Sequence, residues 1–589
     1  MSRPTAAETA RALPAAPKPV AAAASDPASP EALERLSDAL QTLKIHTIVP
    51  LLHKAVAEVR ADRHQEAAQL ILKALEVDER CAVAWHLLAI CREKAGDYTT
   101  ALRCYDSALQ LAPEQQDIAN DIGRLAYLMG MYEIAEQLFA RYLLHDPGSV
   151  EGTNNLACAL RDQMRFDEAI EALRTVIYAN PESAMLWNTL GTVLSEQGEL
   201  DEALTFFDEA LRLEPAFAKA RYNRANIKLL RGDPAAALAD CEEAIPGVSL
   251  ESEIAMMKLA RSTMLIAAGN LAEGWTAYEE RLNPQFADVT HFLVERPAWT
   301  PDTDLAGKHL LLVGEQGLGD EVLFSNVLPD VVEALCPDGR LTLALEHRLV
   351  PLFQRSYPQA TVGRHDTYRV NHHTVRVVKW LGDGADADID CWAPLASLLQ
   401  RFRPSVDAFP DRKAFLTPDP ERVAYWRETL KQAGDGPKVG VVWKSLRINS
   451  SRARYFSPFE QWAAVLKTPG VRFVNLQYGE CAEELAEARD RLGVEIWNPP
   501  GIDLKDDLDD LAALTCALDL SIGPANATTN IAAACGAPVW MVLPPGVWPR
   551  LGDPVRYPWY PTVRVFSAEG YNRWGPVMAE VAEALAREV

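Results

Sequence analysis

The stretch WNTLGTVLSEQGELDEALTFFDEALRLEP, residues 187–215, decides the fold of the first half of the chain. It has small residues at Gly191 and Ala203 and ends at Pro215. Alanine recurs in the phase of Ala203 every 34 residues, at Ala67, Ala101, Ala135, Ala169, Ala203 and Ala237. Proline recurs at the same interval at Pro113, Pro147, Pro181 and Pro215. A fixed period of this length predicts a stack of similar structural units.

Each unit is predicted to be a pair of helices, because small residues allow two helices to approach closely and proline ends the second one. This pattern resembles the tetratricopeptide repeat family. The resemblance implies a superhelix over residues 31–285, opened by a lead-in helix at residues 31–47. Its groove would bind an extended or helical peptide of a partner protein. The alternative is a spacer that only holds domains apart.

The composition limits the possible partners. The chain has 589 residues, enough for three or four domains. Its net charge of −24 argues against nucleic acid or an anionic membrane as a partner. No apolar run approaches the ~20 residues that cross a bilayer. Residues 1–30 are rich in alanine and proline and are expected to form a disordered tail, not a signal peptide. Ten scattered cysteines favour reduced thiols in the cytoplasm.

The second half of the chain is of a different type. After a linker at residues 286–300, strands and helices alternate. The strand HLLLV (309–313) precedes GEQGLGDEVLFSNVLPDVVEAL (314–335), a glycine-rich turn that opens an amphipathic helix. This unit predicts a Rossmann-like half over residues 301–420, with a second such half over residues 421–589. Other expected strands are 341–346, 360–363, 439–445, 471–477, 494–498, 519–523 and 538–544, and other expected helices are 508–517 and 527–536.

Three segments are candidates for the chemistry. In GEQGLGD, Gly317 and Gly319 allow the backbone to approach a ligand, and Asp320 stands at a helix start, where a plain helix cap is the alternative. In WKSLRINSSRARYF (443–456), a basic loop follows a strand and could seat a phosphate, or could simply be solvated. Its cations are Lys444, Arg447, Arg452 and Arg454.

The third segment is SIGPANATTNIAAACG (521–536), a strand, a small-residue turn and a helix start. Backbone N–H groups there, together with Asn526, Thr528 and Thr529, form a candidate anion site. Strand–helix packing without a ligand is the alternative. The acidic loop at residues 382–390 lacks the glutamate that closes a calcium loop, and the histidines lack zinc spacing. We therefore expect no metal ion and no cofactor.

The order of repeats, strand, EQGLGD and helix resembles the bacterial repeat-containing glycosyltransferases and the heptosyltransferase-like group. The resemblance implies a GT-B layout, two Rossmann-like halves with a cleft between them. It implies Asp320 as the general base that deprotonates an acceptor hydroxyl, with His347 and Glu315 as the next candidates. It also implies that Arg452 or Arg454 contacts the donor's phosphate. The chain departs from the usual S-V-D-T-A-x-x-H pattern, since Ala525, Asn526 and Asn530 stand at the acidic, threonine and histidine positions.

Within this group the chain resembles the flagellin glycosyltransferases that carry an N-terminal repeat domain. The resemblance implies that the repeats recruit flagellin and that the second half transfers a nonulosonic acid, pseudaminic or legionaminic, from its CMP-activated form to Ser or Thr. Nucleocytoplasmic N-acetylglucosamine transferases, which use a UDP donor, share the layout and remain an alternative. A non-catalytic adaptor with a degenerate transferase fold is the second alternative.

Overall fold

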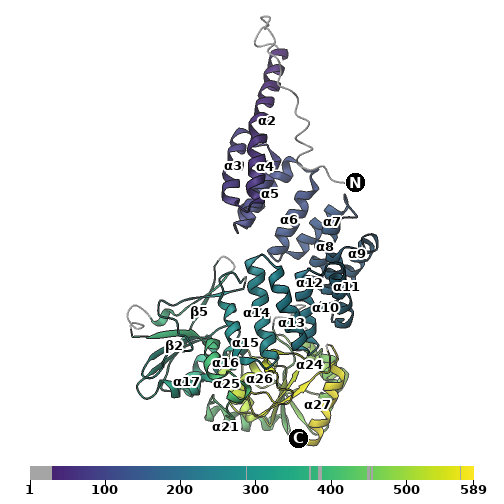
Figure 1. Ribbon diagram of the computed structural model, residues 1–589. Helices are drawn as coiled ribbons and strands as arrows, with labels where there is room; N and C mark the ends of the chain where they lie inside the picture. The colour runs from purple at the N-terminus through teal and green to yellow at the C-terminus, as the bar shows by residue number, and fades with distance from the viewer. Residues whose placement is uncertain are drawn as a thin grey trace. The chain divides into compact units, whose positions relative to one another are not determined.

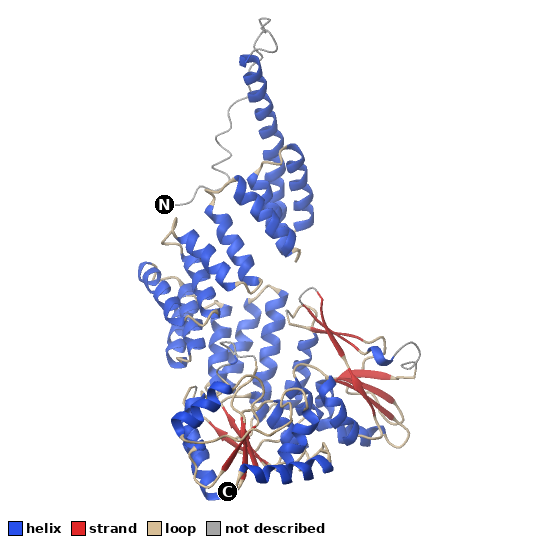
Figure 2. Cartoon of the chain, turned by 180° about the vertical axis from the view of Figure 1, so that it is seen from behind, coloured by secondary structure: helices blue, strands red, loops and turns tan. Residues whose placement is uncertain are grey.

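The computed structural model of the protein describes residues 30–286, 288–370, 373–381, 388–446, 452, 455–570 and 572–588. It divides into two compact units, residues 1–159 and residues 160–589 (Figure 1). Within the described residues, strands occur only in the second unit (Figure 2). Apart from Pro30, the predicted disordered tail lies outside the described residues.

The first unit consists of helices that pack in consecutive pairs, α2 with α3, α4 with α5 and α6 with α7. Their bounds are α2 (Pro30–Arg60), α3 (His64–Val77), α4 (Ala82–Lys94), α5 (Tyr98–Leu111), α6 (Gln116–Leu128) and α7 (Tyr132–Leu143), and α8 (Val150–Asp162) crosses the boundary. Helix α2 is longer than the lead-in helix expected at residues 31–47, and it continues through Pro50.

The second unit begins with further repeats. These helices are α9 (Phe166–Ala179), α10 (Ala184–Gln197), α11 (Leu200–Leu213), α12 (Ala218–Leu230), α13 (Pro234–Ala244), α14 (Glu251–Ala267) and α15 (Leu271–Tyr278). All six periodic alanines are fully buried in the two units. The prolines of the period come two to four residues after the ends of α5, α7, α9 and α11. The predicted tetratricopeptide superhelix is therefore confirmed.

Two parallel sheets follow the repeats. The first has the order β4-β3-β2-β7 and the second the order β12-β11-β10-β8-β9. Every neighbouring pair in both sheets is parallel. The strands are β2 (His309–Val313), β3 (Arg340–Leu345), β4 (Thr361–Arg364), β7 (Cys391–Pro394), β8 (Lys438–Val441), β9 (Arg472–Asn475), β10 (Leu520–Gly523), β11 (Val539–Leu543) and β12 (Val563–Ser567). The apolar runs of the sequence become buried central strands, as expected for parallel sheets.

The helix expected at residues 508–517 is confirmed as α25, but other helices of this region are shorter than the sequence suggested. The helix expected up to residue 335 breaks into α16 (Leu318–Phe324), a 3₁₀ turn and α17 (Leu328–Leu335), where Pro329 stands at the start of α17. Residues 494–498 form no strand, and only a single bridge joins Trp497 to Val474. The other main helices are α18 (Val350–Ser356), α21 (Pro420–Thr429), α24 (Ala482–Glu487), α25 (Leu508–Ala517), α26 (Ala527–Ala534) and α27 (Trp574–Glu588).

A third, smaller sheet was not anticipated from the sequence. It has the order β1-β6-β5, with β1 (Thr290–Leu293), β5 (Asp366–Val370) and β6 (His373–Val377). Strand β1 lies in the segment expected to be a linker, and pairs in parallel with β6. Strands β5 and β6 form an antiparallel pair. Alternation of apolar and polar residues is weak in all three strands, because none of them is buried on a whole face.

The last repeat helix is part of the core of the α/β region. Trp275 of α15 is buried and makes edge contacts with Trp548 and Trp559, both at 6.1 Å between ring centroids. Its indole N–H donates to the carbonyl of Arg403 at 2.8 Å. Gly546, with a φ of +69°, lies so close to α12 that an added Cβ would be 1.8 Å from the carbonyl oxygen of Leu229. The last repeat helices, α14 and α15, thus share one hydrophobic core with the sheets.

No helix among the described residues combines the length and the apolar character that crossing a membrane requires.

We expect Trp275→Ala to lower the free energy of unfolding by about 3–5 kcal/mol, because it removes a buried indole from this core. The control is Tyr178→Ala in α9, where the side chain is 90% exposed and a change within about 0.5 kcal/mol is expected. Urea unfolding measures both variants. Equal stability of the two would mean that the repeats do not share a core with the sheets.

Candidate functional site

Asp320 lies in the first turn of α16, just after the loop that follows β2 of the first parallel sheet. Gln316 has a left-handed backbone, with a φ of 60°, and Gly317 is the N-cap of α16. The Asp320 carboxylate accepts a hydrogen bond from the Gly317 N–H at 3.2 Å. The predicted helix-cap contact is therefore present. It occupies one carboxylate oxygen, and the other has no hydrogen-bond partner among the described residues.

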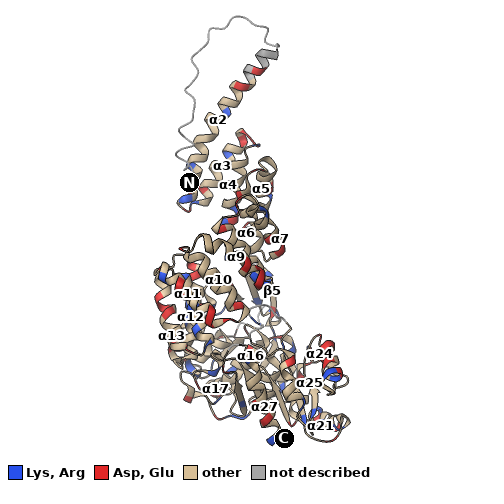
Figure 3. Cartoon of the chain, turned by 90° about the vertical axis from the view of Figure 1, so that its right-hand side faces the viewer, with Lys and Arg blue, Asp and Glu red and all other residues tan. Residues whose placement is uncertain are grey.

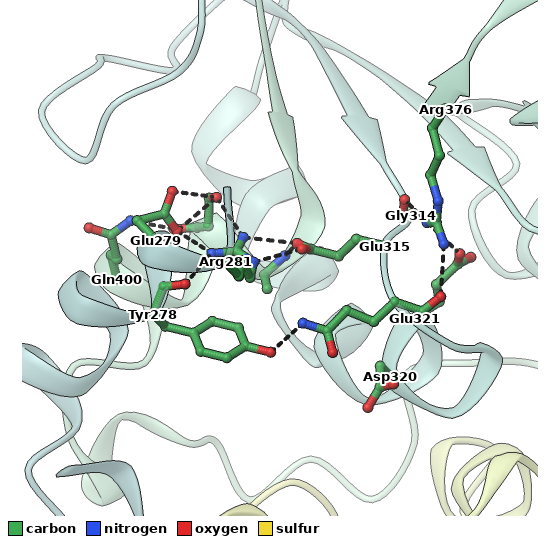
Figure 4. A network of polar contacts seen from close by, with 12 residues as sticks. Tyr278, Glu279, Arg281, Gly314, Glu315, Asp320, Glu321, Arg376 and Gln400 are labelled. Atoms are coloured by element: carbon green, nitrogen blue, oxygen red, sulfur yellow. Dashed lines mark hydrogen bonds and ion pairs between the residues drawn. The ribbon is translucent and has the colours of Figure 1, made fainter. Parts of the chain in front are cut away.

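The surroundings of Asp320 shift its acidity. Burial raises its pKa to about 6, against the opposing effect of the Gly317 N–H. The negative charge of Glu315 raises the pKa further, and the positive charge of Arg452 lowers it. Figure 4 shows the Asp320 carboxylate pointing away from the ion pairs of Glu315 and Glu321. A carboxylate with a pKa near the working pH suits general-base catalysis.

The start of α26 packs directly against the start of α16. The Asn530 side-chain N–H donates to the Gly319 carbonyl at 3.2 Å. An added Cβ at Gly319 would be 3.4 Å from the backbone nitrogen of Ala527 and 3.3 Å from the Asn530 amide nitrogen. The structure therefore brings together the first and third candidate segments, which are about 200 residues apart in the sequence. A side chain at position 319 would therefore make a tight contact with the Asn530 amide.

The predicted anion-binding side chains of α26 have local roles as well. Asn526 accepts from the Thr529 N–H at 3.1 Å, and the Thr529 hydroxyl donates to the Pro524 carbonyl at 2.7 Å. These two side chains cap the helix. Thr528 is buried, and neither its hydroxyl nor the Asn526 side-chain nitrogen has a hydrogen-bond partner among the described residues. Ligand binding by the three side chains stays a prediction.

The two described cations of the basic loop, Lys444 and Arg452, have different surroundings. Lys444 forms an ion pair with Glu484 of α24, so its charge is balanced within the protein. Arg452 is exposed, and its charge reaches Asp320, as the pKa of Asp320 indicates. Arg447 and Arg454 lie outside the described residues. Contact of Arg452 with the donor's phosphate stays a prediction.

The two reserve candidates for the base are placed differently from Asp320. Glu315 is buried and takes two hydrogen bonds from Arg281, at 2.7 and 3.0 Å, and one from the Ala396 N–H at 2.7 Å. Both of its carboxylate oxygens therefore have structural partners (Figure 4). His347 is exposed, and its Nδ1 lies 2.9 Å from a carboxylate oxygen of Glu346. The role of Asp320 as general base stays a prediction.

Sequence reasoning missed several neighbours of Asp320. Arg376 of β6 donates to the Gln316 carbonyl at 2.8 Å and also to the Gly314 carbonyl, so it holds the loop before α16. Tyr557 and Tyr560 are buried; burial raises the pKa of each, and the charge of Asp320 adds to the shift. These tyrosines belong to an aromatic, proline-rich segment at residues 548–566. No spacing pattern in the sequence indicates that Arg376, Tyr557 or Tyr560 lies near Asp320.

The described residues contain no group of three or more His, Cys, Asp or Glu side chains arranged to hold a metal ion.

Comparisons with known proteins match both parts of the chain. Tetratricopeptide repeat models match residues 52–116, 92–152, 154–216 and 188–251. Protein FlbA of Caulobacter vibrioides is 51% identical over 569 residues, which cover 97% of this chain and 95% of that protein. The human protein O-mannosyl-transferase TMTC1 is 27% identical over 177 residues, 29% of this chain and 20% of that protein. Among solved structures, the crystal structure of a tetratricopeptide repeat protein from Parabacteroides merdae is 20% identical in sequence to this chain. The match covers 38% of this chain and 91% of that chain, with a TM-score of 0.33.

We expect Arg281→Met to lower the free energy of unfolding by about 3–5 kcal/mol, because it leaves the buried Glu315 carboxylate without its partner. The control is Arg212→Met in α11, which breaks an exposed pair with Glu209 and should have a much smaller effect on the free energy of unfolding. Urea unfolding separates the two. A small change in the free energy of unfolding for Arg281→Met would mean that Glu315 does not depend on this ion pair.

Proposed function

The chain belongs to the FlbA family, and we propose that it is a protein O-glycosyltransferase that recruits its acceptor protein through the repeats. The observation that carries the proposal is Asp320. It lies in the first turn of α16, next to Gly319, whose carbonyl accepts from Asn530 of α26, and it has a pKa of about 6. Two parallel sheets, each with a helix start at this meeting point, support the proposed GT-B layout. Tetratricopeptide repeats are protein-interaction modules, which supports a protein acceptor.

In the proposed reaction, Asp320 removes the proton from a Ser or Thr hydroxyl of the acceptor. The hydroxyl oxygen then forms a bond to the anomeric carbon of the donor sugar, and the bond from that carbon to the phosphate oxygen breaks. Negative charge develops on the departing nucleotide. Arg452, with Arg447 and Arg454, and the N–H groups at the start of α26 would stabilise that charge without a metal ion.

We propose a CMP-activated nonulosonic acid as the donor, flagellin as the acceptor and the cytoplasm as the place of the reaction. The changed positions Ala525, Asn526 and Asn530 favour a donor other than the usual one of the related enzymes. A UDP-N-acetylglucosamine donor is the second candidate. The same changes are also what a non-catalytic adaptor would show, so the enzyme proposal depends on Asp320.

We expect Asp320→Asn to reduce transfer by about 10²–10⁴, because asparagine caps the helix but cannot accept the proton. Mass spectrometry of flagellin co-expressed with either form measures the modification. The control is Asp490→Asn, which changes an exposed carboxylate outside the candidate site and should leave transfer unchanged. For the wild type, kcat/KM should rise as the pH increases through about 6, since the carboxylate must be ionised to act.

Full modification of flagellin by the Asp320→Asn variant would reduce Asp320 to a helix cap. No modification by the wild type, under conditions in which the repeats still bind flagellin, would favour the adaptor.

We expect CMP to raise the melting temperature more than UDP does, because a ligand that binds only the folded state stabilises it. The double variant Arg452→Ala/Arg454→Ala should lose the shift, because it removes the positive charge that holds the phosphate. Arg489→Ala, which removes an exposed cation on the segment Ala488–Leu492, is the control. A larger shift with UDP would support the N-acetylglucosamine donor, and an unchanged shift in the double variant would remove this loop from the donor site.

A further inference from the structure

Strand β5 forms an open edge of the small sheet. In the order β1-β6-β5 it pairs with β6, and it has no second neighbour among the described strands. Four of its five residues, 367–370, are exposed, on both faces of the strand. Tyr368 is 41% exposed and Val370 is 52% exposed. Exposed edges of this kind can accept a strand from another chain.

The beginning of β5 is tied to the helix that carries Asp320. His365, the residue before β5, lies with its Nε2 3.0 Å from a carboxylate oxygen of Glu321, the neighbour of Asp320. The next strand of the sheet is tied to the same place, since Arg376 of β6 lies 3.2 Å from the same Glu321 oxygen. Thr367 of β5 is paired in register with Arg376. The open edge therefore starts beside the candidate site and leads away from it.

The edge is positively charged in an acidic chain. Among residues 361–380, Arg364, Arg369 and Lys379 are exposed cations and Asp366 is the one carboxylate, whereas the whole chain has a net charge of −24. The fourth cation, Arg376, is buried and paired with Glu321, so it is not counted in the charge of the edge. The charged residues are coloured in Figure 3. Lys379 lies over the ring of Tyr368 at 4.6 Å, and Arg369 is exposed on the strand itself. Positive charge of this kind attracts an acidic partner.

We propose that β5 docks an extended, acidic segment of the acceptor protein, which adds to the sheet as a further strand and leads its Ser or Thr to Asp320. This inference rests on the proposed function. It specifies which segment of the acceptor protein would bind next to Asp320. Backbone hydrogen bonds along β5 would supply affinity, and Tyr368 and Val370 would contact alternate side chains of the segment. A second copy of the chain fits less well, because it would bring one cationic edge against another.

Photo-crosslinking tests the location. A benzoylphenylalanine residue at position 368 of the full chain should capture flagellin, and mass spectrometry should place the crosslink within a few residues of a modified Ser or Thr. The control places the same residue at position 425, where Tyr425 of α21 is 45% exposed. Equal capture at both positions, or crosslinks between two copies of this chain at position 368, would overturn the proposal.

Charge reversal tests the chemistry. We expect Arg369→Glu to lower kcat/KM for flagellin about tenfold, with a smaller effect at high salt, and to leave the CMP-induced rise in melting temperature unchanged. The matched control, Arg489→Glu, changes the net charge equally at another exposed position and should have no effect. An equal loss in both variants would overturn the proposal. If the wild type transfers no sugar but position 368 still captures flagellin specifically, the docking edge stands and the enzyme proposal fails.

Discussion

The buried ion pair between Arg281 and Glu315 is the contact on which the candidate site depends. It joins the 3₁₀ turn at the end of the repeats to the loop that follows β2. Two charges taken out of water are costly unless their hydrogen bonds are satisfied, and here the Ser397 hydroxyl, the Tyr278 carbonyl and the Ala396 N–H complete the network. The position of the Asp320 loop is therefore set partly by a residue of the repeat region.

This arrangement changes what the repeats of the second unit can do. With Trp275 in the same core as Trp548 and Trp559, helices α9–α15 and the two parallel sheets form one compact unit. A partner held by these helices would be held at a fixed place relative to Asp320, without a flexible linker between binding and chemistry. The segment 286–300 is accordingly not a free linker, since it contributes β1 to the small sheet.

The sequence predicted those parts that leave a local or periodic signal. The 34-residue alanine period identifies the repeats because each Ala position is fully buried between helices. The apolar runs identify the central strands. The meeting of Gly319 with Asn530 follows from the rule that ligand-binding loops gather at the carboxyl ends of parallel strands. The ion pair of Arg281, the loop contact of Arg376 and the tyrosines beside Asp320 could not be predicted, since each joins segments that are distant in the sequence and marked by no pattern.

The acidity of Asp320 results from opposed effects, and only some of them would persist in the proposed complex. Burial and Glu315 raise its pKa, while the Gly317 N–H and the charge of Arg452 lower it. Glu315 and Gly317 are held by the fold, whereas the side chain of Arg452 is exposed. A donor phosphate that pairs with Arg452 would remove part of the effect that lowers the pKa. In the proposed mechanism, the bound donor would therefore make Asp320 a stronger base at the moment when a base is needed, and kcat would titrate at a higher pH than kcat/KM.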